Sequence, residues 1–158
     1  MKRTIKSTLA LILALLMTVC LFACKQQVET PETSAGTSEN GGAIAPEGLW
    51  KDATYLSDAE FGEGAKTVTV KVIAEDKSVT FTVKTDAKTL GEALLAHGLI
   101  AGDEGQYGLY IKYVNGIRAD YDLDKRYWNF TKNGEYMMTG ADMTEIADGE
   151  CYEFTYAK

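Results

Sequence analysis

The chain is short of the residues that most catalytic and metal-binding sites use. Its 158 residues include one histidine and three cysteines. The sequence has no Gly-rich phosphate-binding loop, no G-x-S-x-G motif and no zinc-ligand spacing. Carboxylates are numerous, but any acidic surface supplies them, so they do not by themselves indicate a glycosidase pair. These absences predict a protein that is not an enzyme and that has no metal site.

Cysteine is also too scarce to form a disulfide framework. Cys20 and Cys24 lie near the N-terminus, and Cys151 is the third. If Cys20 leaves with a signal peptide and Cys24 carries a lipid, one thiol remains in the mature chain. We therefore expect the fold to rest on packing, without an intramolecular disulfide.

Positive charge is the third shortage. The chain has 16 Lys and Arg residues against 23 Asp and Glu residues. Removal of residues 1–23 takes away Lys2, Arg3 and Lys6 and no acid, which leaves 13 basic and 23 acidic residues and a net charge of −10. An acidic surface repels the phosphate backbone, so nucleic acid is not an expected partner.

The N-terminus has the pattern of a lipoprotein signal peptide. Residues 1–6 include three basic residues, and residues 9–23 are almost entirely apolar, a run shorter than the roughly 20 residues of a spanning helix. The stretch LFAC, residues 21–24, resembles the bacterial lipobox, whose cysteine receives the lipid. We predict a signal peptide at 1–23 and lipid on Cys24, with an ordinary signal peptide cut elsewhere as the alternative. The lipid would anchor the protein to the outer face of the cytoplasmic membrane.

Residues 24–48 are predicted to form a flexible tether after the lipidated cysteine. Gln, Glu, Thr, Ser and Gly dominate this stretch, which contains both prolines of the chain and no aromatic residue. Such a composition cannot bury enough apolar surface to offset the entropy of the chain. The tether would lift the remaining domain, residues 49–158, off the membrane without fixing its orientation.

Residues 49–158 show the periodicities of a small globular domain. Apolar and polar residues alternate over 66–76 and 78–86, as in the two strands of a β-hairpin. Apolar residues recur at helical spacing over 89–99. Aromatic and β-branched residues, with two Asn-Gly turns, predict further strands within 108–116, 127–137 and 150–158. This order predicts the α+β class: a β-grasp-like, two-layer domain with one helix packed on a mixed, mostly antiparallel sheet.

Two stretches resemble a known family. They read GDEGQYGLYIKYVNGI, residues 102–117, and YWNFTKNGEYMMTGADMTEIADGECYEFTY, residues 127–156. They look like the transcobalamin-like C-terminal domain family, which is often found in lipoproteins of Gram-positive bacteria. That family is similar to the β-domain of the cobalamin carriers transcobalamin and intrinsic factor. The resemblance covers residues 49–158 and implies a non-catalytic domain that binds corrinoid (cobalamin) or a similar small molecule, in a Gram-positive bacterium.

The stretch around the second Asn-Gly turn supplies the predicted ligand contacts. For Trp128, in mid-strand, core packing and ligand contact are alternatives. Methionine adapts to flat or irregular ligands, although filling gaps under a loop is the alternative for Met137 and Met138. We predict that the ligand-binding residues are Trp128, Asn133, Tyr136, Met137 and Met138.

A second class of function stays open. On a tethered domain, the same aromatic group would suit a protein-interaction module that binds an envelope protein or another copy of the chain. A concave cluster would favour a small-molecule pocket. A flat apolar patch would favour a partner protein.

Overall fold

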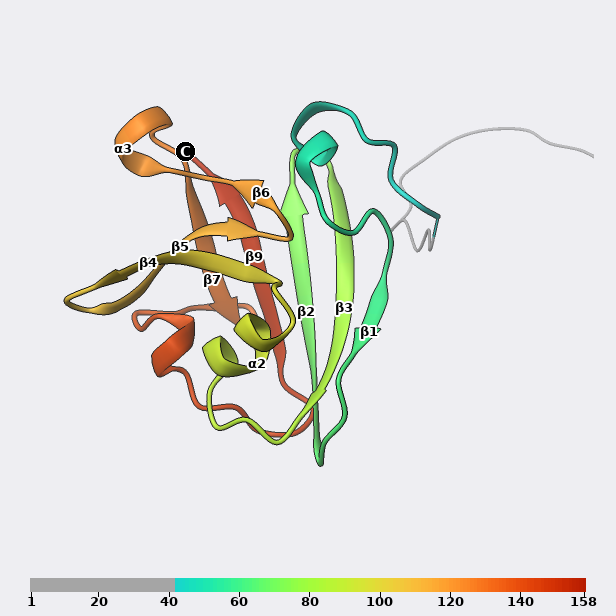
Figure 1. Ribbon diagram of the computed structural model, residues 1–158, viewed down its shortest axis with the longest axis vertical. Coiled ribbons are helices and arrows are strands. Elements are labelled where there is room, and N and C mark those ends of the chain that lie inside the picture. The colour runs from blue at the N-terminus through green and yellow to red at the C-terminus, as the bar shows by residue number, and fades with distance from the viewer. Residues whose placement is uncertain (1–41) are drawn as a thin grey trace, which may run out of the picture. The chain divides into compact units, whose positions relative to one another are not determined.

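The computed structural model describes residues 42–158, which form two β-sheets with short helices between their strands (Figure 1). The predicted signal peptide, residues 1–23, and the predicted lipidation site Cys24 lie outside these residues, as does most of the predicted tether at 24–48. The described residues belong to one compact unit of the chain. No helix within 42–158 is long and apolar enough to span a membrane.

The larger sheet has six strands in the order β1-β3-β2-β9-β7-β8. The β1–β3 and β2–β9 pairs are parallel, and the other pairs are antiparallel. Since β9 lies between β2 and β7, the last strand of the chain occupies the middle of the sheet. The strands are β1 (Ala59–Phe61), β2 (Lys66–Ala74), β3 (Lys77–Thr85), β7 (Tyr127–Lys132), β8 (Glu135–Tyr136) and β9 (Cys151–Ala157).

The smaller sheet has three antiparallel strands: β4 (Ile100–Gly105), β5 (Gly108–Val114) and β6 (Ile117–Arg118). Asn115 and Gly116 join β5 to β6 with φ angles of +51° and +80°. Positive φ at both positions is what a tight two-residue hairpin turn requires, and the Asn-Gly pair provides it.

The helices are short: η1 (Gly48–Asp52), α2 (Leu90–Ala96), α3 (Tyr121–Asp124) and η2 (Ala141–Met143). The helix predicted over 89–99 is confirmed as α2, which begins at a capping box. Thr89 Oγ1 accepts a hydrogen bond from the Glu92 N–H at 3.3 Å, and the Glu92 carboxylate accepts one from the Thr89 N–H at 3.4 Å. These reciprocal bonds satisfy donors that a helix start leaves free.

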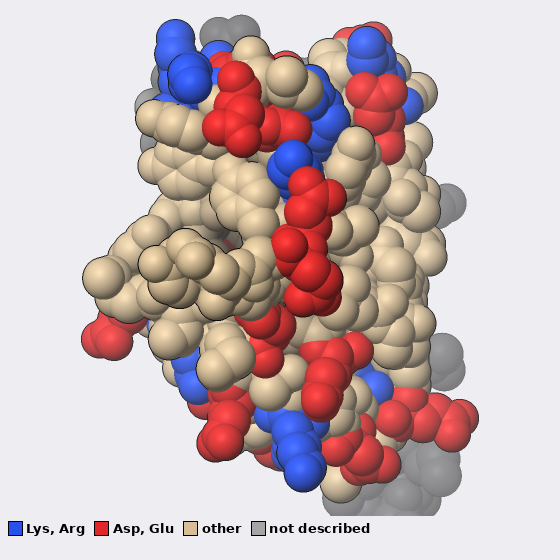
Figure 2. All heavy atoms as spheres, turned by 60° about the vertical axis from the view of Figure 1, so that its left-hand side comes forward, with Lys and Arg blue, Asp and Glu red and all other residues tan. Residues whose placement is uncertain are grey.

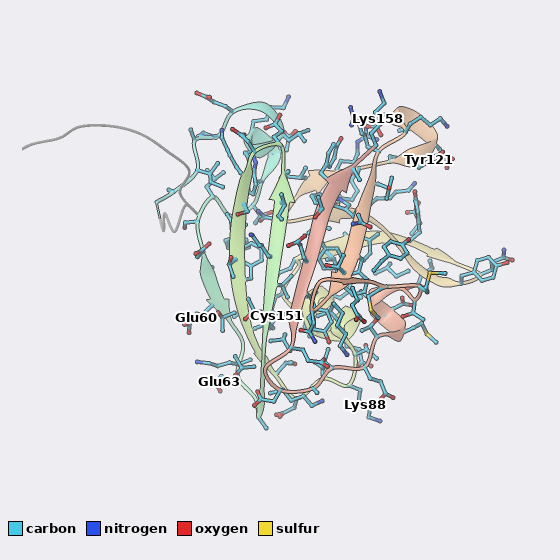
Figure 3. The ribbon with its side chains drawn as sticks, turned by 180° about the vertical axis from the view of Figure 1, so that it is seen from behind. Glu60, Glu63, Lys88, Tyr121, Cys151 and Lys158 are labelled. Atoms are coloured by element: carbon cyan, nitrogen blue, oxygen red, sulfur yellow. The ribbon has the colours of Figure 1, made fainter. Side chains whose placement is uncertain are left out.

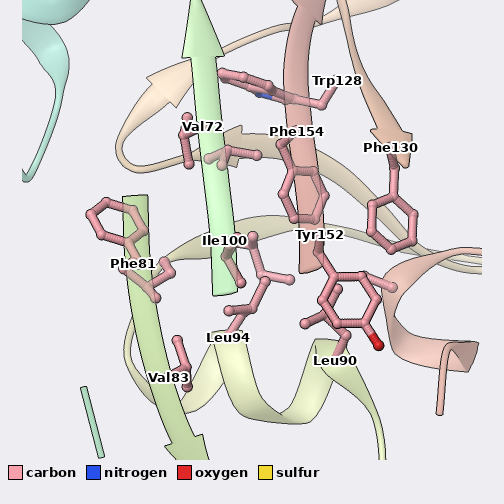
Figure 4. Packing of buried hydrophobic residues seen from close by; sticks show 14 of the residues in the cluster. Val72, Phe81, Val83, Leu90, Leu94, Ile100, Trp128, Phe130, Tyr152 and Phe154 are labelled. Carbon is pink, nitrogen blue, oxygen red and sulfur yellow. The ribbon is translucent and has the colours of Figure 1, made fainter. Parts of the chain in front are cut away.

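The core lies between the two layers. In Figure 1, α2 and the smaller sheet cross one face of the larger sheet. Alternate residues of β2 and β3 turn inward and are buried, as the period-two pattern predicts. Figure 4 shows Leu90 and Leu94 of α2 in one cluster with Phe81 and Phe154 of the larger sheet.

The predicted β-grasp-like arrangement, with a single helix on a single sheet, is wrong. The described residues form two sheets, and the fold is mostly β. The error lies at β4, whose sequence IAGDEG has two glycines and no alternation, so no strand was expected there. Because β4 pairs with β5, residues 100–118 build a layer of their own instead of extending the larger sheet.

The segment before β1 closes one end of the core through Trp50. This residue of η1 is fully buried, and its indole N–H donates a hydrogen bond to the Ala74 carbonyl at the end of β2, at 3.0 Å. Trp128 is also buried, but its indole N–H has no hydrogen-bond partner. The two tryptophans therefore differ in the bonding of one N–H group.

We expect Trp50→Phe to lower the free energy of unfolding by about 1 kcal/mol more than Trp128→Phe does, because one variant loses a buried hydrogen bond and the other does not. Urea unfolding of both variants, compared with the parent chain, measures this difference. Trp128→Phe is the matched control, since it makes the same change of side-chain volume. Equal losses in the two variants would contradict the role of the Trp50 bond.

Candidate functional site

The predicted ligand-binding residues lie on and after β7, but they face in different directions. Trp128 is 8% exposed and belongs to the core, whereas Tyr136 and Met138 are 64% and 90% exposed. Met137 is half-buried and packs against the core. Trp128 and Asn133 lie in the walls of two separate pockets. The structure therefore does not gather the five predicted residues into one site.

The first pocket, here called the Trp128 pocket, lies between the two sheets. It has a volume of about 180 Å³. Figure 2 brings this side of the molecule forward and shows uncharged side chains gathered around a hollow. Its walls come from β5, β7, β9 and residues 139–141, which lead into η2. The lining residues are Leu109, Tyr110, Ile111, Tyr127, Trp128, Phe130, Thr139, Gly140, Ala141 and Phe154.

The pairing of β7 with β9 builds the aromatic wall of this pocket. Trp128 lies opposite Tyr156, and Phe130 lies opposite Phe154. The Trp128 and Tyr156 rings meet edge to face with centroids 5.5 Å apart, and the Phe130 and Phe154 rings stack at 4.9 Å. Such contacts stabilise aromatic pairs beyond the area they bury. A rigid aromatic wall is a suitable surface for a planar or apolar group of a ligand.

The indole N–H of Trp128 is unusual in this wall. It is buried and has no hydrogen-bond partner in the described part of the chain. A buried donor without an acceptor costs roughly 1–3 kcal/mol, and nearly all such groups in proteins find a partner. The indole N–H of Trp128 is therefore a hydrogen-bond donor for which residues 42–158 provide no acceptor.

The opposite wall, on β5, is fixed by ion pairs of Lys112. Its ammonium lies 2.8 Å from Asp103 Oδ2 on β4 and 3.3 Å from Asp120 Oδ2 before α3. Hydrogen bonds to Asp103 and then Asp120 raise the pKa of Lys112 above its ordinary value. Burial favours protonation of Asp120, but the hydrogen bond and charge of Lys112, together with the backbone N–H groups of Asp122 and Leu123, outweigh it and lower the pKa of that carboxyl. Both groups are thus charged at neutral pH, and they tie β5 to β4 and α3.

The second pocket, here called the Asn133 pocket, lies on the outer face of the larger sheet and has a volume of about 270 Å³. Figure 3 views that face and labels Cys151, which is exposed and not in a disulfide. The Asn133 side chain already accepts a hydrogen bond from the Cys151 N–H at 3.0 Å, and φ of Asn133 is +50°. Asn133 thus serves the β7–β8 turn. The lining residues are Thr69, Lys71, Thr80, Thr131, Asn133, Gly134, Cys151, Tyr152 and Glu153.

Beside this pocket, Glu150 joins the ends of β7 and β9. Its carboxylate lies 2.7 Å from Lys132 Nζ and accepts hydrogen bonds from the Tyr152 hydroxyl and the Ala147 N–H. Burial favours protonation, but the hydrogen bonds from Lys132, Tyr152 and the Ala147 N–H, together with the Lys132 charge, outweigh it and hold the pKa of Glu150 below its ordinary value. Burial, followed by the bond to Glu150, raises the pKa of Tyr152.

Residues 42–158 contain no group of three or more His, Cys, Asp or Glu side chains placed to hold a metal ion. Asp120, Asp122 and Asp124 recur at every second position, and the carboxylates of Asp120 and Asp124 bond to groups in and around α3 instead. Asp120 Oδ1 accepts from the Asp122 N–H at 3.1 Å, and Asp124 Oδ2 lies 3.4 Å from Arg118. The acidic stretch therefore caps a turn.

Sequence reasoning missed the β5 wall and the segment 139–141. The aromatic pattern of 108–116 predicted a strand, but it could not show that this strand crosses in front of β7. The segment Thr139–Gly140–Ala141 has no aromatic or charged side chain to mark it as part of a site. Both omissions follow from the second sheet, because the pocket exists where β5 approaches β7.

Comparison with known proteins gives a family match and similar solved structures. Residues 87–158 match a family described as "Domain of unknown function (DUF4430)". A crystal structure of a candidate metal-binding protein from Ruminococcus gnavus ATCC 29149 is 41% identical, covers 60% of this chain and 98% of its own, and superposes with a TM-score of 0.57. Haptocorrin in complex with Cbi is 22% identical over 62% of this chain and 26% of its own, with a TM-score of 0.46. No curated protein matches.

The lowered pKa of Glu150 predicts a pH dependence of stability. A carboxyl whose folded pKa lies below its unfolded value, about 4.3, stabilises the fold above that value and loses the effect as pH falls through the folded pKa. We expect Glu150→Gln to be less stable than the parent at pH 7, and the gap to close as pH drops below about 4. Thermal unfolding between pH 3 and pH 7 measures it.

Glu104→Gln is the matched control, because Glu104 is an exposed carboxylate on β4. It removes the same charge far from the Lys132–Glu150–Tyr152 cluster. A gap between Glu150→Gln and the parent that stayed constant from pH 3 to pH 7 would show that the ionised carboxylate is not the stabilising form.

Proposed function

We propose that this chain, which belongs to the family of the Ruminococcus gnavus protein and carries a DUF4430 domain, binds a small molecule in the Trp128 pocket without catalysing a reaction. Corrinoid is the first ligand class to test. We also propose that a lipid on Cys24 holds the domain at the outer face of the bacterial membrane, on the tether that precedes residue 49.

The observation that carries this proposal is the pocket itself. Its walls are mainly aromatic and aliphatic, with an unused indole N–H in one of them. Small-molecule sites combine such walls with a few polar groups. A volume of about 180 Å³ is below the roughly 300–1,000 Å³ of a drug-sized site. The pocket therefore suits one edge or ring of a larger ligand, with the exposed Tyr110 and Tyr127 at its lip.

The position of the resembling stretches in the structure favours corrinoid as the ligand. Every residue that lines the Trp128 pocket lies within residues 102–117 or 127–156, the two stretches that resemble the transcobalamin-like family. These two stretches therefore supply the whole lining of the pocket. A corrinoid is a flat macrocycle with a polar rim, and its edge is of the kind that an aromatic slot accepts.

Two alternatives have support of their own. Large apolar side chains outside the pocket are exposed, among them Tyr107, Tyr136, Met138 and Met143, and such surfaces suit a partner protein of the cell envelope. The Ruminococcus gnavus relative is described as a candidate metal-binding protein, so metal ions belong in the same assay. The absence of a ligand cluster in residues 42–158 makes metal the weaker alternative.

We expect dicyanocobinamide to bind the chain from residue 25 onward with saturable one-to-one heat in a calorimetric titration. Calorimetry is preferred because corrinoids absorb where tryptophan emits. Tyr110→Ala and Tyr127→Ala should each weaken binding by about tenfold, since each removes an aromatic contact at the lip. Both side chains are exposed, at 43% and 38%, so the variants should stay folded.

Tyr121→Ala is the matched control, because Tyr121 is 50% exposed on α3 and does not line the pocket. Parallel titrations with Ca²⁺ and Zn²⁺ test the metal alternative. No heat with dicyanocobinamide at high micromolar concentration would refute stand-alone corrinoid binding. Equal effects of all three tyrosine variants would place the ligand elsewhere.

We expect Cys24→Ala to abolish lipid attachment and membrane retention when the full chain is expressed in a Gram-positive host. Thioether-linked lipid requires the cysteine thiol, and stable anchoring requires attached acyl chains. Labelling with a palmitate analogue and fractionation of cells report the two properties. Cys20→Ala, which should leave both unchanged, is the control; labelled Cys24→Ala protein would contradict the assignment.

A further inference from the structure

Asp142 connects the two walls of the Trp128 pocket. It lies on η2, directly after the segment 139–141 that lines the pocket. Its Oδ2 accepts a hydrogen bond from the Leu109 N–H, in the β5 wall, at 3.1 Å. The carboxylate is therefore held between the segment 139–141 on one side and β5 on the other.

Three glycines from separate elements make room for this side chain. A Cβ at Gly108 would lie 2.1 Å from Asp142 Oδ2, and one at Gly140 would lie 2.5 Å from Oδ1. A Cβ at Gly91, in α2, would lie 2.6 Å from the Asp142 Cα. Gly140 has φ of −66°, which any residue adopts, so its backbone does not call for glycine. The reason for glycine there is the space that the carboxylate takes.

The second carboxylate oxygen is left without a partner. Asp142 Oδ1 is buried and accepts no hydrogen bond from the described residues. Two buried side-chain polar atoms in residues 42–158 are unpartnered, Asp142 Oδ1 and Trp128 Nε1. One belongs to a residue that lines the pocket, and the other is packed against Gly140, which also lines it. An unpaired buried carboxylate oxygen is costly, and such groups are found where function needs them.

We infer that Asp142 sets the specificity of the pocket, by reserving Oδ1 for an N–H or O–H donor of the bound ligand. This rests on the proposed function and deepens it. An ionised carboxylate accepts hydrogen bonds and donates none, so it pairs with a carboxamide, hydroxyl or ammonium and repels a carboxylate. The occupant is thus a ligand whose edge carries neutral carboxamides or hydroxyls, not carboxylates. Asp142 itself does not line the pocket, and Oδ1 lies directly behind Gly140, which does and which has no side chain. Gly140 must therefore move aside when the ligand binds, so that Oδ1 meets the ligand.

The test compares two corrinoids that differ at the rim. Dicyanocobinamide carries side-chain carboxamides, and dicyanocobyrinic acid carries carboxylates at those positions. For the parent chain from residue 25 onward, we expect tighter binding of the amide. In Asp142→Asn the ratio of the two affinities should fall by about tenfold or more, because the new amide group also donates to carboxylates. A role limited to folding would lower the melting temperature and leave this ratio unchanged.

Asp148→Asn is the matched control. Asp148 also accepts a backbone N–H, from Thr67 on β2 at 2.7 Å. Neither carboxylate lines the pocket, but Asp142 lies against Gly140, which does line it. Asp148→Asn removes the same charge from an acidic protein, so it reports the general repulsion of anionic ligands. Its affinity ratio should equal that of the parent chain.

Gly140→Ala provides an independent variant if Asp142→Asn does not fold. The added methyl group presses on Oδ1 and should also reduce the preference for the amide. Parent-like ratios in the folded variants would overturn the role of Asp142 and leave the proposed function standing. Loss of preference in Asp148→Asn to the same extent would also overturn it, since general charge would then be the cause. If the parent chain binds neither corrinoid, both proposals fall.

Discussion

The pairing of β9 with two strands is the constraint on which the rest of the structure depends. β9 is parallel to β2 on one side and antiparallel to β7 on the other. Its register places Phe154 opposite both Val72 and Phe130, so three inward side chains meet at one level of the core. A slip of one residue would turn Phe154 outward and bring Glu153 or Thr155 into the core, which makes the register strongly specified.

The Trp128 pocket follows from this register and from the second sheet. The β7–β9 pairing sends Trp128 and Phe130 to the inner face, where the smaller sheet crosses in front of them. Close packing of two sheets needs side chains that interdigitate. On β5 the nearest wall consists of Leu109, Tyr110 and Ile111, and Tyr110 is partly exposed instead of filling the space. A pocket remains, and Asp142 holds its two sides at a fixed separation through Leu109.

The sequence predicted the local structure better than the arrangement of layers. Alternation in β2 and β3, the helix over 89–99 and the hairpin turn at Asn133 are local patterns, and the structure confirms each of them. The second sheet depends on β4, whose glycines and acidic residues form no pattern, and on contacts between segments far apart in the chain. The pattern of a single sequence does not indicate such contacts, so the β-grasp-like prediction was wrong about the second sheet.

The same limit applied to the site. Trp128 was predicted as a candidate from its residue type, and the structure places it in a pocket wall. Asn133 was predicted to supply polar contacts to the ligand, but it lies in the β7–β8 turn and borders the other pocket, where its side chain bonds to the Cys151 N–H. No pattern in the sequence marked Asp142 as a candidate site residue. A free carboxylate oxygen beside a glycine is visible only once Gly91, Gly108 and Gly140 have been brought together from three elements.

The charge of the protein disfavours an anionic ligand in the proposed site. The chain is acidic, and Figure 2 shows acidic side chains bordering the uncharged area around the hollow. The lysine on the pocket strand, Lys112, is already bonded to Asp103 and Asp120. A phosphate or carboxylate ligand would have to break those bonds or be buried without a counter-charge, and both are costly. A neutral ligand with an apolar body and a hydrogen-bonding rim meets neither obstacle. Such a rim could offer an acceptor to Trp128 Nε1 and a donor to Asp142 Oδ1, the two buried side-chain atoms of residues 42–158 that are unpartnered.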